Sequence, residues 1–532
     1  MQTRHIVIEG SIQGVGFRPF VYNLAKKLGI KGKVWNSHKG VEILLQANDK
    51  TIRQFLEELS SHPPSLSKIH RINSKTVSVK EQFSDFSIEH SSSTKALHSV
   101  IIPTDAAICP KCIEELQDPN KRRYRYPFIS CVECGPRYTI LKGLPYDRAN
   151  SAMGAFTPCK ECQEEYDDPN NRRFHAQNIS CPKCGPDITL HDKEGILAKE
   201  EKALELLAKS LEAGRIAALK GTGGYHLVCD ASNSEALKRL RSLKRRPHKP
   251  FAVMVSKLED ARAYIEPDAY NESLLSSKER PIVIGKKVKQ EKLSELVAPY
   301  IDKLGVMLAY TPLHLMLLDL FDKPIVVTSA NVSGAPICAA FEEIQAYQQL
   351  WDICLDHDLE ILNRCDDSVV MGVENRTIML RSARGYAPAC FRLPSEMKQN
   401  TLFLGANQKN TIGFSFKDHL ILSPYLGDLG TVESWEHIER SMRFFKELYH
   451  FTPDRYVCDK HPGYETNKWA KRQTTGKVTE VQHHAAHIAS VMFEHNLNEE
   501  VLGVAFDGTG YGDCGAVNFY GVRRRAIDAL PI

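Results

Sequence analysis

The sequence has no long hydrophobic run and no excess of one charge. The start, Met1–Glu9, contains no stretch of signal-peptide length, and the most apolar later stretch, residues 306–321, is interrupted by His314 and Asp319. Lys and Arg number 69 against 65 Asp and Glu, so the net charge of +4 is too even to require nucleic acid or an anionic membrane as partner. We therefore expect a soluble, cytoplasmic protein with no membrane partner.

The composition also excludes a disordered or fibrous chain. Hydrophobic residues make up 42% and charged residues 25% of the sequence, which is the usual balance of globular proteins. The chain has 532 residues, and at about 150 residues per domain this length predicts three or four domains rather than one core. The predicted domains are residues 1–90, 105–190, 198–388 and 398–532.

The first domain has the pattern strand, helix, strand, strand, helix, strand, which is typical of a split βαβ (ferredoxin-type) sandwich. The predicted elements are residues 5–9, 17–28, 33–37, 41–46 and 51–60, with a last strand within 76–88. A Ser-rich run at 91–94 then predicts a linker.

Residues 198–388 alternate amphipathic helices with short apolar strands, which predicts an α/β domain. The helices are predicted at 203–213 and 234–244, and the strands at 216–219, 251–255, 281–284 and 325–327. A strand at 402–405 and a long helix at 432–448 open the last domain. The fold class is therefore multidomain, with α/β and α+β parts.

More than half of the cysteines lie in one region, which is an internal repeat. Eight of the 15 form four Cys-x-x-Cys pairs, and aligning residues 109–140 with 159–190 gives 16 identities in 32 positions. Two pairs separated by 18 residues supply four thiolates, which is typical of a structural zinc site with no ligand position left for water. We predict two zinc ions, held by Cys109, Cys112, Cys131 and Cys134 and by Cys159, Cys162, Cys181 and Cys184.

Two other interpretations of this region stay open. The cysteine pairs could be redox dithiols, although both pairs recur together with the turns Gly135-Pro136 and Gly185-Pro186. The run Lys121–Tyr126 interleaves basic and aromatic residues, as in a nucleic-acid-binding ribbon, but the second copy, Asn171–Ala176, retains less of this pattern. A basic run is more often a solvated face or a domain contact, so nucleic acid is not the partner we favour.

A glycine-rich turn, Gly10–Gly16, follows the first predicted strand and leads to Arg18 at the start of a helix. The backbone N–H groups of such a turn can close around a phosphate, and a guanidinium adds a planar fork for its oxygens. Together with Gly32–Asn36, the motif resembles the acylphosphatase signature. The resemblance implies that Arg18 binds the phosphate and that Asn36 positions the attacking water.

Three polar motifs lie in the α/β region: Lys220–His226, Lys244–Pro250 and Thr328–Gly334. Each alone fits an ordinary loop or a charged helix end, but together they resemble the nucleotide-binding site of YrdC-like domains. Cations that neutralise a triphosphate, with hydroxyl and amide groups that order it, suit an adenylation site. The resemblance implies a site for ATP and Mg²⁺ that contains Lys220, Lys244, Arg246, Ser329 and Asn331.

A histidine pair lies near the end of the chain. His483 and His487 are four residues apart, so on a helix they share one face, and Asp507 follows after a predicted strand. Such pairs are more often incidental than ligating, but two imidazoles and a carboxylate suit iron or zinc. We predict a third divalent metal at these residues.

These motif sets, in this order, resemble one family, the HypF carbamoyltransferases of [NiFe]-hydrogenase maturation. The resemblance covers residues 1 to about 515. It implies an acylphosphatase-like domain, two zinc modules, a YrdC-like domain and a carbamoyl-transferring domain of the actin and sugar-kinase type. It also implies a reaction in which carbamoyl phosphate is hydrolysed to carbamate, ATP converts the carbamate to carbamoyl adenylate with release of pyrophosphate, and the carbamoyl group passes to the C-terminal cysteine of HypE.

The resemblance stops where residues 514–532 replace the glycine- and tryptophan-rich strand of the family. We therefore expect an incomplete transferase domain and weak transfer to HypE. Two alternative functions stay open. One is a threonylcarbamoyl-adenylate synthase of tRNA modification, which shares the YrdC-like domain but neither the acylphosphatase signature nor the zinc modules. The other is a zinc-ribbon scaffold that binds RNA.

Overall fold

The computed structural model describes residues 2–79, 82–89, 91, 101–290, 292–473, 476–507, 510–512, 517–518 and 521–525. Most of the predicted linker and most of the chain after residue 512 lie outside these residues. Neither the linker nor the expected incomplete transferase domain is therefore tested. The chain forms two compact units. The first comprises Met1–Ser333, Ile337–Pro388 and Leu448–His450, and the second comprises Gly334–Pro336, Ala389–Glu447 and Phe451–Ile532.

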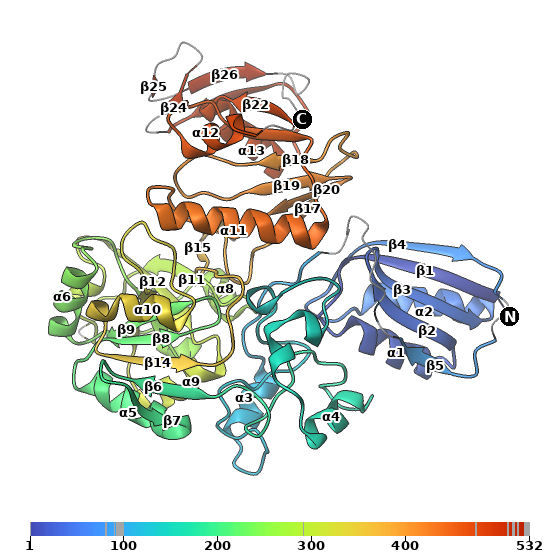
Figure 1. The fold of residues 1–532 in the computed structure, drawn as a ribbon, viewed down its shortest axis with the longest axis horizontal. Helices are drawn as coiled ribbons and strands as arrows, with labels where there is room; N and C mark the ends of the chain where they lie inside the picture. The colour runs from blue at the N-terminus through green and yellow to red at the C-terminus, as the bar shows by residue number, and fades with distance from the viewer. Residues whose placement is uncertain are drawn as a thin grey trace. The chain divides into compact units, whose positions relative to one another are not determined.

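The N-terminal part of the first unit is a five-stranded sheet in the order β4-β1-β3-β2-β5, with both helices packed on one face (Figure 1). The elements are β1 (Gln2–Ser11), α1 (Phe17–Lys27), β2 (Lys31–Ser37), β3 (Gly40–Ala47), α2 (Asp49–Ser61), β4 (Lys68–Thr76) and β5 (Phe86–Ile88). The predicted sandwich is confirmed, but the sequence pattern missed β4. This edge strand is mostly polar and has no buried residue, so it lacks the apolar alternation that marks a strand.

The repeat region has little regular structure. Each copy begins with a short helix directly after its first cysteine, α3 (Pro110–Gln117) in copy one and α4 (Lys160–Asp167) in copy two. A short 3₁₀ turn, Tyr138–Ile140, ends copy one, and two more, Arg148–Asn150 and Ala152–Ala155, lie between the copies. The remainder is held by turns and by side-chain contacts between the copies.

The rest of the first unit is built on a mixed sheet in the order β16-β15-β11-β12-β10-β13-β9-β8-β14-β6-β7. Its strands are β6 (Ile188–His191), β7 (Ile196–Lys199), β8 (Ala217–Lys220), β9 (Tyr225–Asp230), β10 (Ala252–Val255), β11 (Ile282–Lys286), β12 (Lys303–Leu308), β13 (Ile325–Ser329), β14 (Ile353–His357), β15 (Val369–Val373) and β16 (Arg376–Arg381). Helices cover both faces, so the central strands are apolar on both sides.

One face of this sheet packs against α5 (Glu200–Glu212) and α9 (Pro312–Phe321). The other packs against α6 (Ser234–Leu243), α7 (Leu258–Ala261), α8 (Ala269–Ser276) and α10 (Phe341–Ala346). Neighbouring strand residues alternate between the two cores: Val327 lies in the first and Val326 in the second. The predicted α/β domain is confirmed as a fold class.

The second unit contains a six-stranded sheet in the order β17-β20-β19-β18-β21-β22. Its elements are β17 (Ala389–Arg392), β18 (Thr401–Phe403), β19 (Gly413–Phe416), β20 (His419–Leu422), α11 (Val432–Tyr449), β21 (Arg455–Asp459), α12 (Glu465–Lys471), β22 (Lys477–Val481) and α13 (His483–Glu494). Two short pairs follow, β23 (Val501–Ala505) with β26 (Gly521–Arg525) and β24 (Gly510–Tyr511) with β25 (Val517–Asn518).

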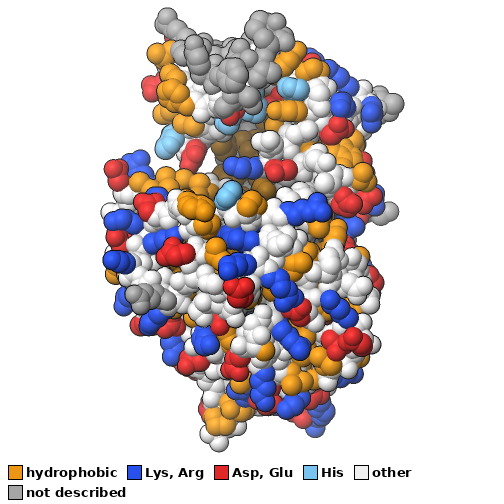
Figure 2. Space-filling model, turned by 90° about the vertical axis from the view of Figure 1, so that its left-hand side faces the viewer, with side chains coloured by type: hydrophobic (Ala, Val, Ile, Leu, Met, Phe, Trp, Pro, Cys, Tyr) orange, Lys and Arg blue, Asp and Glu red, His pale blue; other side chains and the backbone are white. Residues whose placement is uncertain are grey.

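The surface agrees with the even charge of the sequence. On the face shown in Figure 2, basic and acidic side chains are interspersed rather than gathered by sign. Among the described helices, none combines the length and apolar character needed to cross a membrane.

Candidate functional site

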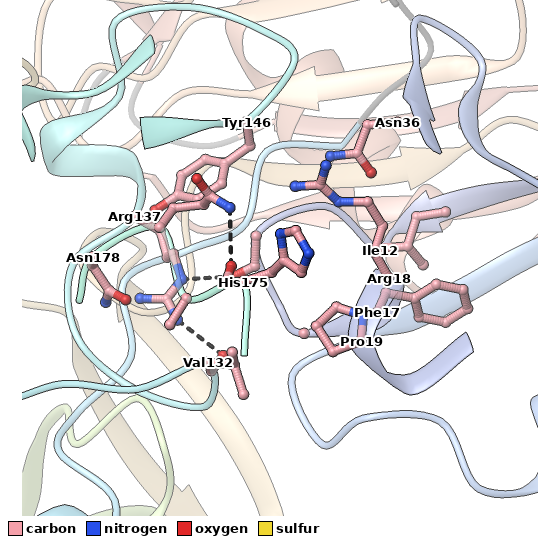
Figure 3. A pocket seen from close by; sticks show the side chains of 14 residues that line it. Ile12, Phe17, Arg18, Pro19, Asn36, Val132, Arg137, Tyr146, His175 and Asn178 are labelled. Atoms are coloured by element: carbon pink, nitrogen blue, oxygen red, sulfur yellow. Dashed lines mark hydrogen bonds between the residues drawn. The ribbon is translucent and has the colours of Figure 1, made fainter. Parts of the chain in front are cut away.

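The turn between β1 and α1 forms one wall of a pocket (Figure 3). Gly14 and Gly16 take positive φ angles of 70° and 75°, and α1 begins directly afterwards, so that Arg18 lies in its first turn. Asn36 comes from β2. The opposite wall belongs to the repeat region. The lining residues are Ile12, Gly14, Gly16, Phe17, Arg18, Pro19, Asn36, Val132, Arg137, Tyr146, His175, Ala176, Gln177 and Asn178.

Arg18 and Asn36 are both placed for a ligand in this pocket. The Arg18 side chain is 10% exposed, and its Nη2 donates to Oδ1 of Asp147 at 2.9 Å, which fixes the guanidinium. Asn36 is 1% exposed, and neither atom of its amide has a hydrogen-bond partner in the described part of the chain. Leaving a buried polar group unpaired costs about 1–3 kcal/mol, so this amide is suited to bind a ligand or a water.

The repeat region holds the glycine-rich turn directly. Arg137 Nε donates to the carbonyl oxygen of Gly14 at 2.7 Å, and the Tyr146 N–H donates to Oε1 of Gln13 at 3.2 Å. A Cβ at Gly14 would lie 2.6 Å from the Tyr146 ring. The glycine is therefore required by this packing, a role that the phosphate-turn interpretation of the sequence did not include.

Both cysteine clusters have the geometry of a zinc site. In the first, Sγ of Cys131 lies 3.7 Å from Sγ of Cys109 and Sγ of Cys134, and Cys134 lies 3.6 Å from Cys112. The second cluster repeats these distances: 3.7 Å for Cys159–Cys181 and Cys181–Cys184, and 3.6 Å for Cys184–Cys162. Tetrahedral zinc with bonds of about 2.3 Å places sulfurs about 3.8 Å apart, so four thiolates fit the ion. A disulfide needs about 2.05 Å.

The two copies exchange arginines, in that an arginine of each copy donates a hydrogen bond to a cysteine sulfur of the other. Arg122 Nη1 donates to Cys162 Sγ at 3.3 Å, and Arg172 Nη1 donates to Cys112 Sγ at 3.1 Å. The next residue repeats the exchange through the backbone: Arg123 Nε donates to the Ser180 carbonyl at 2.6 Å. The basic run that suggested nucleic acid therefore forms a contact between the copies, and Arg123 is 1% exposed.

A carboxylate in each copy completes the exchange. Glu115 accepts from both Arg172 and Arg173, and Glu165 accepts from both Arg122 and Arg123. Although burial opposes it, the guanidinium groups of Arg173 and Arg172 lower the pKa of Glu115 to about 2. Both acids are therefore ionised at neutral pH and bind the arginines of the other copy.

Four of the five predicted nucleotide-binding residues meet at the carboxyl end of β13, a central strand of the large sheet. Lys244, directly after α6, donates from Nζ to the carbonyl oxygens of Ser329 and Asn331 at 2.7 and 2.8 Å. Arg246 donates to the hydroxyl of Thr328 at 3.0 Å. Burial and the nearby charge of Arg246 lower the pKa of Lys244 to about 7, and burial lowers that of Arg246 to about 10. Two cations that share a partly dry site favour an anion.

Lys220 is engaged elsewhere in the same sheet. Its ammonium donates to the carbonyl oxygen of His357 at 2.7 Å and lies 3.1 Å from Oδ1 of Asp356, both at the end of β14. Gly221 and Thr222, which follow it, line a second and largely apolar pocket together with Phe128 of the repeat region. A nucleotide role for Lys220 therefore stays a prediction.

In the second unit, three predicted metal ligands converge. One ligand atom each from His483, His487 and Asp507 lies within 4.8 Å of the others. Asp507 Oδ2 is 2.8 Å from His483 Nε2 and 3.2 Å from His487 Nε2. His483 Nδ1 donates to Asp459 Oδ2 at 2.5 Å, a contact that raises the pKa of His483 and leaves Nε2 for a metal. This nitrogen and oxygen donor set fits a divalent ion.

Several site residues were missed in the sequence. Tyr146 and His175, which line the pocket, and Asp147, which pairs with Arg18, match no motif and stand far from Arg18 along the chain, so only the fold brings them together. Asp459 is the last residue of β21, and it was not predicted from the sequence to be a partner of His483.

Comparison with known proteins covers most of the chain. Four family profiles match: "Acylphosphatase" at residues 4–88, "HypF finger" at 108–141 and 159–191, "Telomere recombination" (Sua5, YciO and YrdC) at 209–383, and "HypF Kae1-like domain" at 396–494. Threonylcarbamoyl-AMP synthase of Vibrio campbellii is 29% identical over 160 residues, which is 28% of the chain.

Proteins called carbamoyltransferase HypF match over nearly the whole chain. The one from Synechocystis sp. is 44% identical over 97% of this chain and 67% of its own length, and the probable one from Methanocaldococcus jannaschii is 41% identical over 95% and 67%. A solved structure of full-length HypF in its phosphate- and nucleotide-bound form has a TM-score of 0.95 at 41% identity, and the match covers 99% of this chain and 69% of that one. The chain spans about two thirds of the length of these relatives, and on this sequence and structural similarity it belongs to the HypF family of carbamoyltransferases.

Proposed function

We propose that this chain uses its three sites in sequence. Carbamoyl phosphate is hydrolysed in the pocket of Arg18 and Asn36, ATP activates the resulting carbamate as carbamoyl adenylate at the large sheet, and the carbamoyl group is transferred to the C-terminal cysteine of HypE at the second unit. The observation that carries the proposal is the buried, unpartnered amide of Asn36 in the same pocket as a fixed guanidinium.

The first step needs positioning and charge stabilisation more than a strong base, because an acyl phosphate already has a good leaving group. Arg18, at the N-terminal end of α1, is suited to the phosphate oxygens. The Asn36 amide has both a donor and an acceptor, so it can orient a water toward phosphorus.

The second step requires charge neutralisation of a triphosphate. Lys244 and Arg246 supply two cations, and the hydroxyl of Ser329, which donates to Asn331 Oδ1 at 2.9 Å, holds the Asn331 side chain at the carboxyl end of β13. When ATP binds with Mg²⁺, the oxygen of carbamate attacks the α-phosphate and pyrophosphate leaves.

The third site would hold a divalent metal through His483, His487 and Asp507. A bound metal would supply a positive centre for a phosphate or carbamoyl oxygen. Asp459 orients His483, and this is the contribution of the protein that the geometry supports directly.

One assay tests the sequence of steps. The chain is incubated with labelled carbamoyl phosphate, MgATP and HypE. The release of phosphate, AMP and pyrophosphate and the label on HypE are followed separately. We expect pyrophosphate release that depends on carbamoyl phosphate, and no label on HypE lacking its C-terminal cysteine. Pyrophosphate release that instead needs threonine and bicarbonate would overturn the proposal in favour of a threonylcarbamoyl-adenylate synthase.

A further inference from the structure

The second copy of the repeat forms part of the wall of the Arg18 pocket, beside Val132 and Arg137 of the first copy. Figure 3 shows the His175 imidazole projecting into the space between Arg137 and Arg18. Ala176, Gln177 and Asn178 continue this wall. The space in front of Arg18 is therefore bounded by residues of the repeat as well as by the glycine-rich turn, so a ligand bound at the start of α1 lies against both.

The two copies differ sharply at these positions. Copy one has Arg125-Tyr126-Pro127-Phe128 where copy two has His175-Ala176-Gln177-Asn178, although half of the aligned positions are identical. Pro127 and Phe128 line the apolar pocket beside the large sheet. Arg125 and His175 both have a left-handed backbone, with φ of 49° and 55°, so the backbone is shared and only the side chains have diverged.

A chain of hydrogen bonds favours one tautomer of the His175 imidazole. The backbone N–H of Arg148 donates to Oε1 of Gln177 at 2.8 Å, which orients the amide, and Gln177 Nε2 then donates to the Tyr166 oxygen at 3.0 Å. The Tyr166 hydroxyl is left to donate to His175 Nδ1, at 3.2 Å. In this tautomer Nδ1 accepts, and Nε2–H is left as a donor with no hydrogen-bond partner among the described residues.

The imidazole is neutral at physiological pH. Burial and the charge of Arg18 lower the pKa of His175 to about 4. A neutral imidazole next to a guanidinium adds a directional N–H without a second positive charge.

We propose that His175 is a catalytic residue of acyl phosphate hydrolysis, whose Nε2–H donates to the acyl oxygens of carbamoyl phosphate as negative charge develops on them. This inference rests on the proposed first step. Water attacks phosphorus, and the bond between phosphorus and the bridging oxygen breaks with its electron pair going to that oxygen. Both water protons stay on phosphate, so carbamate and dihydrogen phosphate form. His175 keeps its proton and stabilises the departing carbamate.

Two variants of matched size test this role. His175→Gln keeps an N–H donor, and His175→Met removes it. We expect His175→Met to lower kcat for carbamoyl phosphate hydrolysis about a hundredfold, as for loss of one donor to a developing oxyanion, and His175→Gln to retain most of the rate. Inhibition by inorganic phosphate, which has no acyl end, should be unchanged in both. Arg125→Ala, at the equivalent position of copy one, is the control and should hydrolyse normally.

The outcomes separate this inference from the proposed function. If Arg18→Ala hydrolyses normally, the proposed first step is wrong. If Arg18→Ala is inactive but His175→Met is as fast as His175→Gln, only the role of His175 is overturned. Weaker phosphate inhibition or a zinc content below two in His175→Met would show a structural effect, and it too would overturn the role.

Discussion

Arg172, in the second copy of the repeat, donates to the sulfur of Cys112 in the first copy at 3.1 Å, and Arg122 makes the equivalent contact with Cys162 in the opposite direction. Hydrogen bonds to metal-bound thiolates stabilise their negative charge and orient them. Each cluster therefore depends on a side chain of the other copy, so the two zinc sites are expected to gain and lose metal together.

The first prediction concerns this dependence. Arg172→Ala should speed the release of zinc to a chelator from the first cluster about tenfold or more, because outer-shell partners typically contribute 10- to 100-fold in metal affinity. Lys121→Ala, which removes an exposed cation elsewhere in the repeat region, is the control.

Cys109→Ser should lower the zinc content below two per chain. Unchanged zinc content in that variant would show that the cluster does not bind zinc.

The second prediction concerns Arg18. Arg18→Ala should reduce carbamoyl phosphate hydrolysis about a hundredfold or more, because a fixed charge on the phosphate is lost from a sheltered pocket. Phosphate release measures it. Lys26→Ala changes an exposed cation on the same helix, paired with Asp85, and should leave the rate unaltered. Equal rates of hydrolysis in Arg18→Ala and Lys26→Ala would contradict the assignment of Arg18 to the phosphate site.

The third prediction follows from the pKa of about 7 for Lys244. As the pH rises above 7, the free site loses this charge, so binding of MgATP requires uptake of a proton. Affinity should fall up to about tenfold per pH unit until the pKa of the complex is reached. Calorimetry in buffers of different ionisation enthalpy measures the number of protons taken up when MgATP binds. Lys244→Arg, which stays charged, should take up less; an equal uptake would show that another group titrates.

The fourth prediction concerns Asp459. Asp459→Asn weakens the acceptor that orients His483, so a divalent ion bound in addition to the two zinc ions should be held 10- to 100-fold more weakly. Elemental analysis after dialysis against a graded chelator counts the ions. Glu465→Gln, an exposed acid on α12 that pairs with Lys468, should keep the third ion. If both variants lose one ion, the loss is not specific to Asp459 and its role in holding the metal is contradicted.

The sequence predicts best where spacing alone defines the chemistry. The cysteine spacings locate both clusters, and the paired motifs around Lys244 and Asn331 meet as expected. The polar edge strand β4 was missed because a strand is normally recognised by the alternation of buried apolar and exposed polar residues, and β4 has no buried residue. His175 was missed for a different reason: nothing local distinguishes it, and its proximity to Arg18 exists only after two separate parts of the first unit pack together.

The arginine exchange has the pattern of a twofold-symmetric homodimer, in which residue i of one subunit contacts residue j of the other and the reverse. Here both halves belong to one polypeptide: Arg123 binds Glu165, and Arg173 binds Glu115. Covalent linkage makes the pairing independent of protein concentration. It also frees the halves from identity, because a true homodimer must place the same side chain at both equivalent positions. Gene duplication thus permits one half to form an apolar wall with Phe128 while its twin carries His175.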